Sequence, residues 1–236
     1  MWFLTMWYVT NQKLGGSALG MQRILGLGSY QTAWTWLHKM RRAMVRPGRD
    51  QLAGRVEVDE TYVGGDEEDV RGRQTETKAI VAVAIEVLEP RGFGRVRLRR
   101  VVDVSAGSLT PFVREVVAPG SLVHTDGWNG YNQLAQHGYR HERSILATSD
   151  APAHVVMPAV HRVASLLKRW LLGTHQGAVS TKHLYYYLDE FTFRFNRRTS
   201  RARGLLFYRL VEQAVHVDPI HYKQLVGGKQ AGKHKG

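Results

Sequence analysis

The sequence predicts an α/β protein in which a mixed β-sheet is flanked by helices and preceded by a small helical region. Residues 1–50 have helical patterning, and three strand-like segments follow in succession. Helical and strand-like segments then alternate before the chain ends in helices. Consecutive strands followed by alternating elements are typical of a sheet that combines antiparallel and parallel strands, with helices on both faces.

Residues 1–50 are expected to form a small DNA-binding region. Residues 17–25 are a short amphipathic stretch that Gly26 and Gly28 interrupt, and Ser29 is a suitable N-cap for a second helix over residues 30–44. Two helices joined by a tight turn with glycine are the helix-turn-helix pattern. A short Arg-, Pro- and Gly-containing linker then separates this region from the predicted sheet.

Residues 55–63 begin the predicted sheet. Their apolar and polar side chains alternate, as in a strand with one buried face, and they end at the turn signal Gly64 and Gly65. Residues 79–88 are an almost continuous apolar run rich in Val and Ile, which is typical of a central strand buried on both faces. Residues 95–104 are a third strand, and the three together predict an antiparallel meander.

The remaining elements alternate and then give way to helices. This part of the chain would form one α/β domain over residues 51–215. The basic end of the chain, residues 216–236, is expected to be a disordered tail. We expect strands over 121–125 and 139–145, and helices over 108–117, 128–137, 160–172, 181–196 and 205–215.

The chain is strongly basic. Its 236 residues include 33 Lys and Arg against 20 Asp and Glu, which gives a net charge of +13. A polyanionic partner, nucleic acid ahead of an anionic membrane surface, explains the excess, although a soluble basic protein can have the same composition. The sequence has no Cys, which excludes disulfides and thiolate zinc sites, and no apolar stretch long enough to span a bilayer. We expect a cytoplasmic, nucleoid-associated protein that binds DNA and no membrane.

Two aspartates are the strongest candidates for a catalytic metal site. Asp59 lies within the first strand, where Asp is uncommon, and Asp126 lies where the strand over residues 121–125 ends. Ligands in α/β sheets bind outside strand ends, and carboxylates from neighbouring strands suit Mg²⁺ or Mn²⁺, ions that promote phosphoryl transfer. Each residue also has an ordinary interpretation: Asp59 as a solvent-facing strand residue and Asp126 as a helix N-cap.

His161 and Lys168 are seven residues apart within a predicted helix. Seven residues are nearly two helical turns, so both side chains project from one face. The imidazole there can serve a metal, and Lys168 with the adjacent Arg169 can contact DNA phosphates. An ordinary surface helix with a solvated His161 is the alternative, and spacing alone favours it.

A run of arginines lies near the end of the helix predicted over residues 181–196. We expect Arg194, Arg197 and Arg198 to contact the DNA backbone through salt-sensitive interactions. A solvated helix face near the negative end of the helix dipole is the competing interpretation. The net charge of the chain favours DNA.

Five segments between about Met6 and Val215 form a recognisable set. They are GGSALGMQRILGLGSYQTAWTWLHKMRRAM, VEVDETYVGG, HTDGWNGYNQL, LLKRWLLGTHQG and KHLYYYLDEFTFRFNRR, of which the second and the last are the most specific. Together they resemble the bacterial insertion-sequence transposases of the ISXO-like group, which belong to the larger DDE superfamily.

This resemblance implies a ribonuclease-H-like transposase catalytic domain over residues 51–215. It implies that Asp59 and Asp126 are the first two catalytic acids and hold Mg²⁺ or Mn²⁺. The third acid of the superfamily falls at His161, a departure that the group tolerates, and an imidazole there favours Mn²⁺ or positions a water. Glu190 is the alternative third acid, but it has no Lys seven residues further along.

The implied function is metal-dependent cleavage of DNA at insertion-sequence ends and strand transfer into target DNA, by a homo-oligomer assembled on DNA. Members of the group usually carry a four-cysteine zinc ribbon ahead of the helical region, and this sequence has no Cys. A late start of the sequence and a truncated copy both explain that difference. A non-catalytic helix-turn-helix DNA-binding protein, a ribonuclease-H-like nuclease of repair or RNA, and a decayed transposase are the alternative functions.

Overall fold

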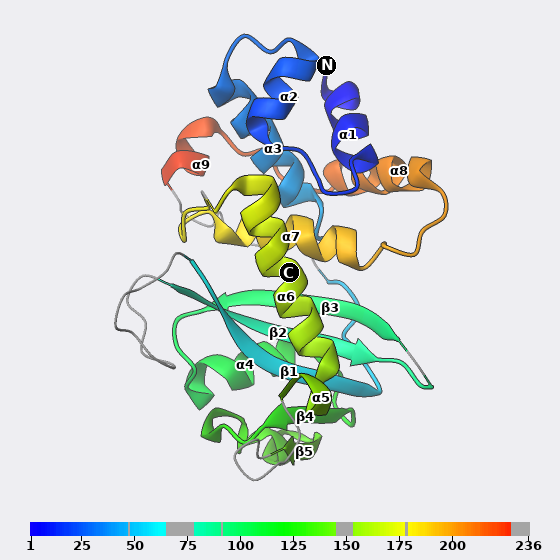
Figure 1. Cartoon of the computed structure of the whole chain (residues 1–236), viewed down its shortest axis with the longest axis vertical. Coiled ribbons are helices and arrows are strands. Elements are labelled where there is room, and N and C mark those ends of the chain that lie inside the picture. Colours follow the sequence, from blue (N-terminus) through cyan, green and yellow to red (C-terminus); the bar gives the residue numbers. More distant parts are fainter. Residues whose placement is uncertain (47, 65–77, 91, 145–152, 178, 228–236) are drawn as a thin grey trace. The chain divides into compact units, whose positions relative to one another are not determined.

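A computed structural model describes the chain over residues 1–46, 48–64, 78–90, 92–144, 153–177 and 179–227. The chain packs as two compact units (Figure 1). The sheet unit is Asp50–Arg169, and the helical unit combines Met1–Arg49 with Trp170–Gly236. The predicted single domain over residues 51–215 therefore differs from the structure, because the helices beyond Arg169 pack with the N-terminal helices.

The sheet unit contains a five-stranded sheet with the order β3-β2-β1-β4-β5. The first three strands form the predicted antiparallel meander, while β4 pairs with β1, and β5 with β4, in parallel. The sheet is therefore mixed. Its strands are β1 (Arg55–Val63), β2 (Ala79–Val87), β3 (Phe93–Val101), β4 (Leu122–Asp126) and β5 (Arg140–Ser144).

Helices lie on both faces of this sheet. Val56 and Val58 of β1 pack with Leu109 and Phe112 of α4 (Ala106–Val116) in the buried core on one face. Because side chains alternate along a strand, Glu57 points to the other face, where it accepts hydrogen bonds from the first turn of α6. The strand order and the two helical layers confirm the predicted ribonuclease-H-like α/β fold. The short α5 (Ala153–Val156) precedes α6 (Pro158–His175).

The segment after β4 differs from the helix predicted over residues 128–137. It forms two short 3₁₀ turns, η1 (Asn129–Tyr131) and η2 (Leu134–His137). Gly130 within η1 is closely packed, since a Cβ atom there would lie 2.6 Å from the carbonyl oxygen of Val104. Gly138, at φ 83°, ends η2 in the left-handed region that favours glycine.

The helical unit has its own apolar core. Val9, Met21 and Leu37 from the N-terminal helices pack with Phe193 and Leu210 from the C-terminal ones. This shared core is the physical reason why the C-terminal helices join residues 1–49. The helices are α1 (Trp2–Asn11), α2 (Ala18–Leu25), α3 (Tyr30–Ala43), α7 (Leu184–Phe195), α8 (Arg203–Ala214) and α9 (Tyr222–Gly227).

The chain beyond residue 215 is more ordered than the sequence predicts. Residues 216–236 were expected to be a disordered tail, but α9 lies within them and Ile220 and Leu225 are buried. Both side chains pack in one cluster with Tyr186 of α7. Residues 228–236 lie outside the described residues, so the tail prediction is corrected over residues 216–227.

The α2–α3 pair has the predicted helix-turn-helix arrangement. The Ser17 side chain accepts a hydrogen bond from the N–H of Gly20 at the start of α2, and Gly26 ends that helix at φ 61°. The Ser29 side chain accepts from the N–H of Thr32 and caps α3. These caps satisfy backbone donors that each helix start leaves unpaired.

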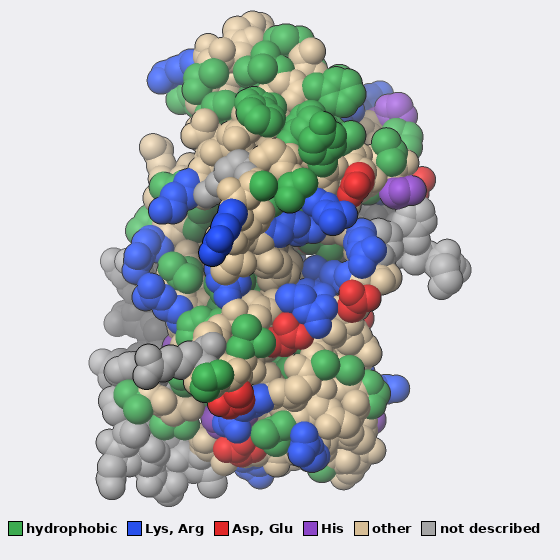
Figure 2. Space-filling view, turned by 90° about the vertical axis from the view of Figure 1, so that its right-hand side faces the viewer, with side chains coloured by type: hydrophobic (Ala, Val, Ile, Leu, Met, Phe, Trp, Pro, Cys, Tyr) green, Lys and Arg blue, Asp and Glu red, His purple; other side chains and the backbone are tan. Residues whose placement is uncertain are grey.

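Apolar side chains gather on the exposed side of α1 and α8 (Figure 2). The rings of Phe3 and Trp7 contact that of Phe207 edge-on, and Tyr208 contacts Phe207 in the same way. Across the described residues, no helix is long and apolar enough to cross a membrane.

Candidate active site

Asp59 and Asp126 lie on neighbouring parallel strands. The β1–β4 pairing ends at Glu57 opposite His124, and each aspartate follows two residues further along its strand. Equal spacing from a paired position puts the two side chains on the same face of the sheet, which is also the face of Glu57. Asp126 ends β4, and in open α/β sheets ligands bind outside the carboxyl ends of parallel strands. The structure therefore brings the two predicted metal ligands to one edge and one face.

Local backbone donors orient both carboxylates. Asp59 Oδ1 accepts a hydrogen bond from the N–H of Glu60 at 2.8 Å, and Asp126 Oδ1 accepts from the N–H of Trp128 at 3.0 Å. Trp128 is held in turn, since its indole N–H donates to the carbonyl of Val104 at 2.7 Å. Asp126 thus fixes a turn instead of capping a long helix, and both aspartates remain partly exposed.

The charges of nearby acidic side chains act on Tyr131. Its side chain is fully buried, and its hydroxyl donates to Glu60 Oε2 at 3.0 Å. Burial raises the pKa of Tyr131 well above its ordinary value, and the charges of Glu60, Asp59 and Asp126 raise it further. The hydroxyl therefore stays protonated and keeps its hydrogen bond to Glu60. Sequence reasoning missed Tyr131, although it closes the TDGWNGY run that begins beside Asp126.

A neutral histidine lies next to the aspartates on the same face. His124 Nδ1 lies 3.2 Å from a guanidinium nitrogen of Arg55, and His124 Nε2 lies 2.8 Å from the hydroxyl of Ser144. An arginine can only donate, so Nδ1 accepts and Nε2 carries the proton that is donated to Ser144. Burial, followed by the charge of Arg55, lowers the pKa of His124, although Glu142 opposes this shift.

His161 is the predicted third ligand and lies in the first turn of α6. Its side chain is partly buried, and its backbone N–H reaches the carbonyl of Met157 at 3.5 Å. Within the described part of the chain, no group of three or more His, Asp or Glu side chains is placed to hold a metal. The structure thus brings together two of the three predicted residues and does not complete the group with His161. The donors that it does bring together, two carboxylates, have the oxygen chemistry that Mg²⁺ and Mn²⁺ prefer.

Comparisons with known proteins identify the family of the chain. Residues 51–196 match the family of ISXO2-like transposase domains. The chain belongs to this transposase family. A stretch of 112 residues, 48% of this chain, is 28% identical to an uncharacterized transposase-like protein of Haemophilus influenzae and covers 89% of that protein. The family predicted from the sequence is confirmed.

A distant structural likeness accompanies the family match. It is to a solved simian T-cell lymphotropic virus intasome in complex with the PP2A regulatory subunit B56 gamma, with a TM-score of 0.37 and 16% identity. The alignment covers 73% of this chain and 63% of that one, so the transposase chain spans less than two thirds of the length that it matches.

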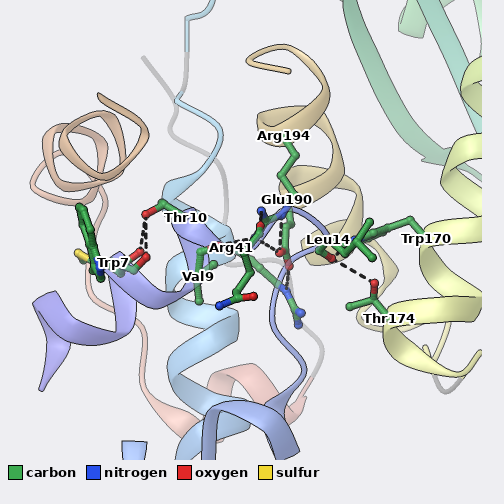
Figure 3. A network of polar contacts seen from close by, with 11 residues as sticks. Trp7, Val9, Thr10, Leu14, Arg41, Trp170, Thr174, Glu190 and Arg194 are labelled. Atoms are coloured by element: carbon green, nitrogen blue, oxygen red, sulfur yellow. Dashed lines mark hydrogen bonds and ion pairs between the residues drawn. The ribbon is translucent and has the colours of Figure 1, made fainter. Parts of the chain in front are cut away.

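Glu190, the alternative third acid, has a different setting in this member of the family. It is fully buried in α7, where Oε2 accepts from Arg41 Nε at 2.7 Å and Oε1 accepts from Arg194 Nε at 2.8 Å (Figure 3). Burial alone would raise the pKa of Glu190, but the charges of Arg194 and Arg41 lower it to about 2. Guanidinium donors engage both oxygens, so the geometry gives Glu190 an ion-pair role.

Arg194 does not fit its predicted role as a DNA contact. Besides Glu190, its guanidinium donates to the carbonyls of Gln12 and Val9, each at 2.8 Å (Figure 3). Nε and both Nη atoms are therefore committed within the helical unit. The run of arginines in the sequence gave no sign of this, because the partners lie more than 180 residues away.

The other predicted DNA contacts differ in their packing and exposure. Arg197 and Arg198 lie over the rings of Phe193 and Phe195, at 4.2 and 4.1 Å from the ring centroids, and each donates to a carbonyl at the end of α7. Arg198 is nevertheless exposed, whereas Arg197 is partly buried. Lys168 and Arg169 are both exposed on α6, where a phosphate can reach them.

Proposed function

We propose that this member of the ISXO2-like family is a DNA transposase that cleaves insertion-sequence ends and joins them to target DNA with Mg²⁺ or Mn²⁺. The observation that carries the proposal is the placement of Asp59 and Asp126 on one face of two neighbouring parallel strands, each two residues beyond the last paired position. The family match over residues 51–196 supports the same class of reaction.

The two aspartates would hold the metal, since hard oxygen donors suit both ions. When bound, a divalent cation stabilises the charge that develops on the attacking and leaving oxygens. Water attacks a phosphodiester at the element end, and the strand breaks to leave a 3′-hydroxyl. That hydroxyl then attacks a target phosphodiester, so that one P–O bond forms as another breaks. Tyr131 keeps its proton throughout and holds Glu60 beside the site.

Exposed cations would hold the DNA backbone. Lys168 and Arg169 on α6 are the strongest candidates, and Arg198 adds an exposed guanidinium on the helical unit. Phosphate contacts of this kind position DNA and do not read its sequence. The α2–α3 pair would recognise the element ends, with the second helix of the pair in the major groove. We expect the protein to act as a homo-oligomer on paired ends.

A strand-joining assay tests the proposal. The substrate is a pre-cleaved element end, taken from the DNA that flanks the gene, with Mg²⁺ or Mn²⁺ present. Joined product should form with wild-type protein and with Asp218→Asn, a control at an exposed aspartate of the helical unit, and should vanish with Asp126→Asn. Strand joining by Asp59→Ala in Mn²⁺ would refute the proposed metal site.

A non-catalytic DNA-binding protein or decayed transposase is the second candidate function. It is favoured by the absence, within the described residues, of a third side chain grouped with the two aspartates. It predicts DNA binding that neither metal nor Asp126→Asn changes, with no cleavage and no joining. The same assay therefore separates the two functions.

A further inference from the structure

The first turn of α6 lacks a capping residue of its own. Pro158 is the first residue of α6 and has no N–H, so Ala159 and Val160 carry its first two backbone donors. Met157 stands directly before the helix, and its thioether is only a weak acceptor. Ala159 and Val160 are 0% and 1% exposed, so water cannot replace the missing partner.

Glu57 supplies that partner from the central strand. Its Oε2 accepts from the N–H of Ala159 at 2.9 Å and from that of Val160 at 3.0 Å, across more than 100 residues of sequence. Glu57 is itself 2% exposed. A carboxylate at a helix start also meets the positive end of the helix dipole. One oxygen atom thus joins β1 to the start of α6.

Both ends of this contact lie close in sequence to residues of the candidate site. Glu57 precedes Asp59 by two residues on β1, and Val160 directly precedes His161 on α6. We infer that Glu57 is a positioning residue that fixes the start of α6 to β1 and so holds His161 in place relative to Asp59. This inference rests on the proposed metal-dependent function, although the helix anchor itself does not.

An anchor and a metal ligand require different properties of Glu57. An anchor needs an oxygen at the right reach, whereas a glutamate that bound the metal directly would contribute its negative charge as well. Glu57→Gln keeps the reach and removes the charge. Glu57→Asp keeps the charge and is one methylene too short to reach both N–H groups.

The first measurement is amide hydrogen exchange of the α6 start in metal-free protein. Glu57→Asp should speed exchange at Ala159 and Val160 by roughly 10- to 100-fold, the range expected when buried N–H groups lose their acceptor. Glu57→Gln should remain within about threefold of wild type. Equal protection in all three proteins would overturn the anchor, whether or not the protein proves to be a transposase.

The second measurement is the dissociation constant of Mn²⁺, followed by its electron paramagnetic resonance. Loss of a group that orients a metal ligand typically weakens metal binding by about 10- to 100-fold, and we expect this of Glu57→Asp but not of Glu57→Gln. Ser17→Ala removes the cap of α2 in the other unit, controls for general destabilisation and should leave Mn²⁺ affinity unchanged.

Three further outcomes would each refute a different part of the proposal. If Glu57→Gln weakens Mn²⁺ binding more than Glu57→Asp, the charge matters and the positioning role is refuted in favour of direct binding. If Glu57→Asp frees the α6 amides but binds Mn²⁺ normally, the contact serves the fold alone and the positioning role fails. If the wild-type protein binds no Mn²⁺ that Asp126→Asn abolishes, the proposed function fails, while hydrogen exchange still decides whether Glu57 anchors α6.

Discussion

Replacing Glu190 by Gln removes the negative charge from a buried network that joins α3, α7 and the end of α1. In the wild type, Arg41 and Arg194 both donate to Glu190, and the Arg41 and Glu190 side chains are 2% and 0% exposed. Gln has nearly the same shape and keeps one oxygen acceptor. The variant therefore leaves two guanidiniums in a dry environment with no carboxylate to neutralise them.

The size of the effect follows from the pKa of Glu190. A fall in this pKa from 4.5 to about 2 means that the ionised form of Glu190 is more stable in the folded helical unit than in the unfolded chain. At about 1.4 kcal/mol for each pKa unit, the charge contributes on the order of 3 kcal/mol at neutral pH. This value agrees with the cost of about 3–5 kcal/mol for removing one partner of a buried ion pair.

Urea unfolding followed by tryptophan fluorescence measures this loss. Of the six Trp residues, only Trp128 lies in the sheet unit, so the signal reports mainly on the helical unit. Glu212→Gln is the matched control, because Glu212 pairs with Arg209 where both side chains are more than 60% exposed. The control should change the free energy of unfolding by less than about 0.5 kcal/mol.

Two results would refute this reasoning. A loss below about 1 kcal/mol in Glu190→Gln would mean that the network contributes little. A folded Glu190→Gln protein with weakened Mn²⁺ binding would instead make Glu190 a metal ligand. The pH dependence is a further check. Because the pKa of Glu190 is lowered in the folded state, its contribution should disappear as pH falls from about 4.5 towards 2, and the variant and wild type should then converge.

Three further predictions concern single side chains. His38 is fully buried with neither ring nitrogen hydrogen-bonded, and burial lowers its pKa to about 2. Below about pH 6.5, His38 binds a proton in the unfolded chain but not in the folded protein, so the free energy of unfolding falls as the pH falls. His38→Phe should reduce the slope of this dependence by up to about 1.4 kcal/mol per pH unit. An unchanged slope would contradict this prediction. Tyr131→Phe removes the donor to Glu60 and should destabilise the sheet unit by about 1.5–3 kcal/mol, measured by the urea dependence of amide hydrogen exchange in β1 and β4. Lys168→Ala should lower the slope of log affinity against log salt for DNA by about 1, whereas a slope equal to that of wild type would remove Lys168 from the phosphate contacts.

Local pattern was enough to predict the sheet and the face of the candidate site. Alternation in β1 separates Val56 and Val58 from Glu57 and Asp59, and the apolar run of β2 requires burial on both faces. Asp126 could be placed because it ends a short strand. These inferences need only neighbouring residues, whose physical preferences the sequence displays directly.

Partners that are distant in sequence could not be predicted in the same way. Arg41 and Glu190 are 149 residues apart, and Glu57 and Ala159 are 102 apart. Arg194 looks like a DNA contact in the sequence because arginines cluster near it, but backbone carbonyls of Val9 and Gln12 engage it. The division into two units was missed for the same reason, since it depends on which apolar faces of the helices meet.

The setting of each acid in the fold distinguishes structural from functional carboxylates. Glu190 and Glu57 are at most 2% exposed, and each accepts hydrogen bonds from donors far away in the sequence. A buried charge without such donors would be too costly to keep, so the fold explains both residues without a ligand. Asp59 and Asp126 are partly exposed, and each accepts a hydrogen bond from a backbone N–H one or two residues away. Partial exposure leaves room for a cation, and carboxylate oxygens are the donors that Mg²⁺ and Mn²⁺ prefer. Divalent cations should therefore stabilise the sheet unit of the wild type and have much less effect on Asp126→Asn.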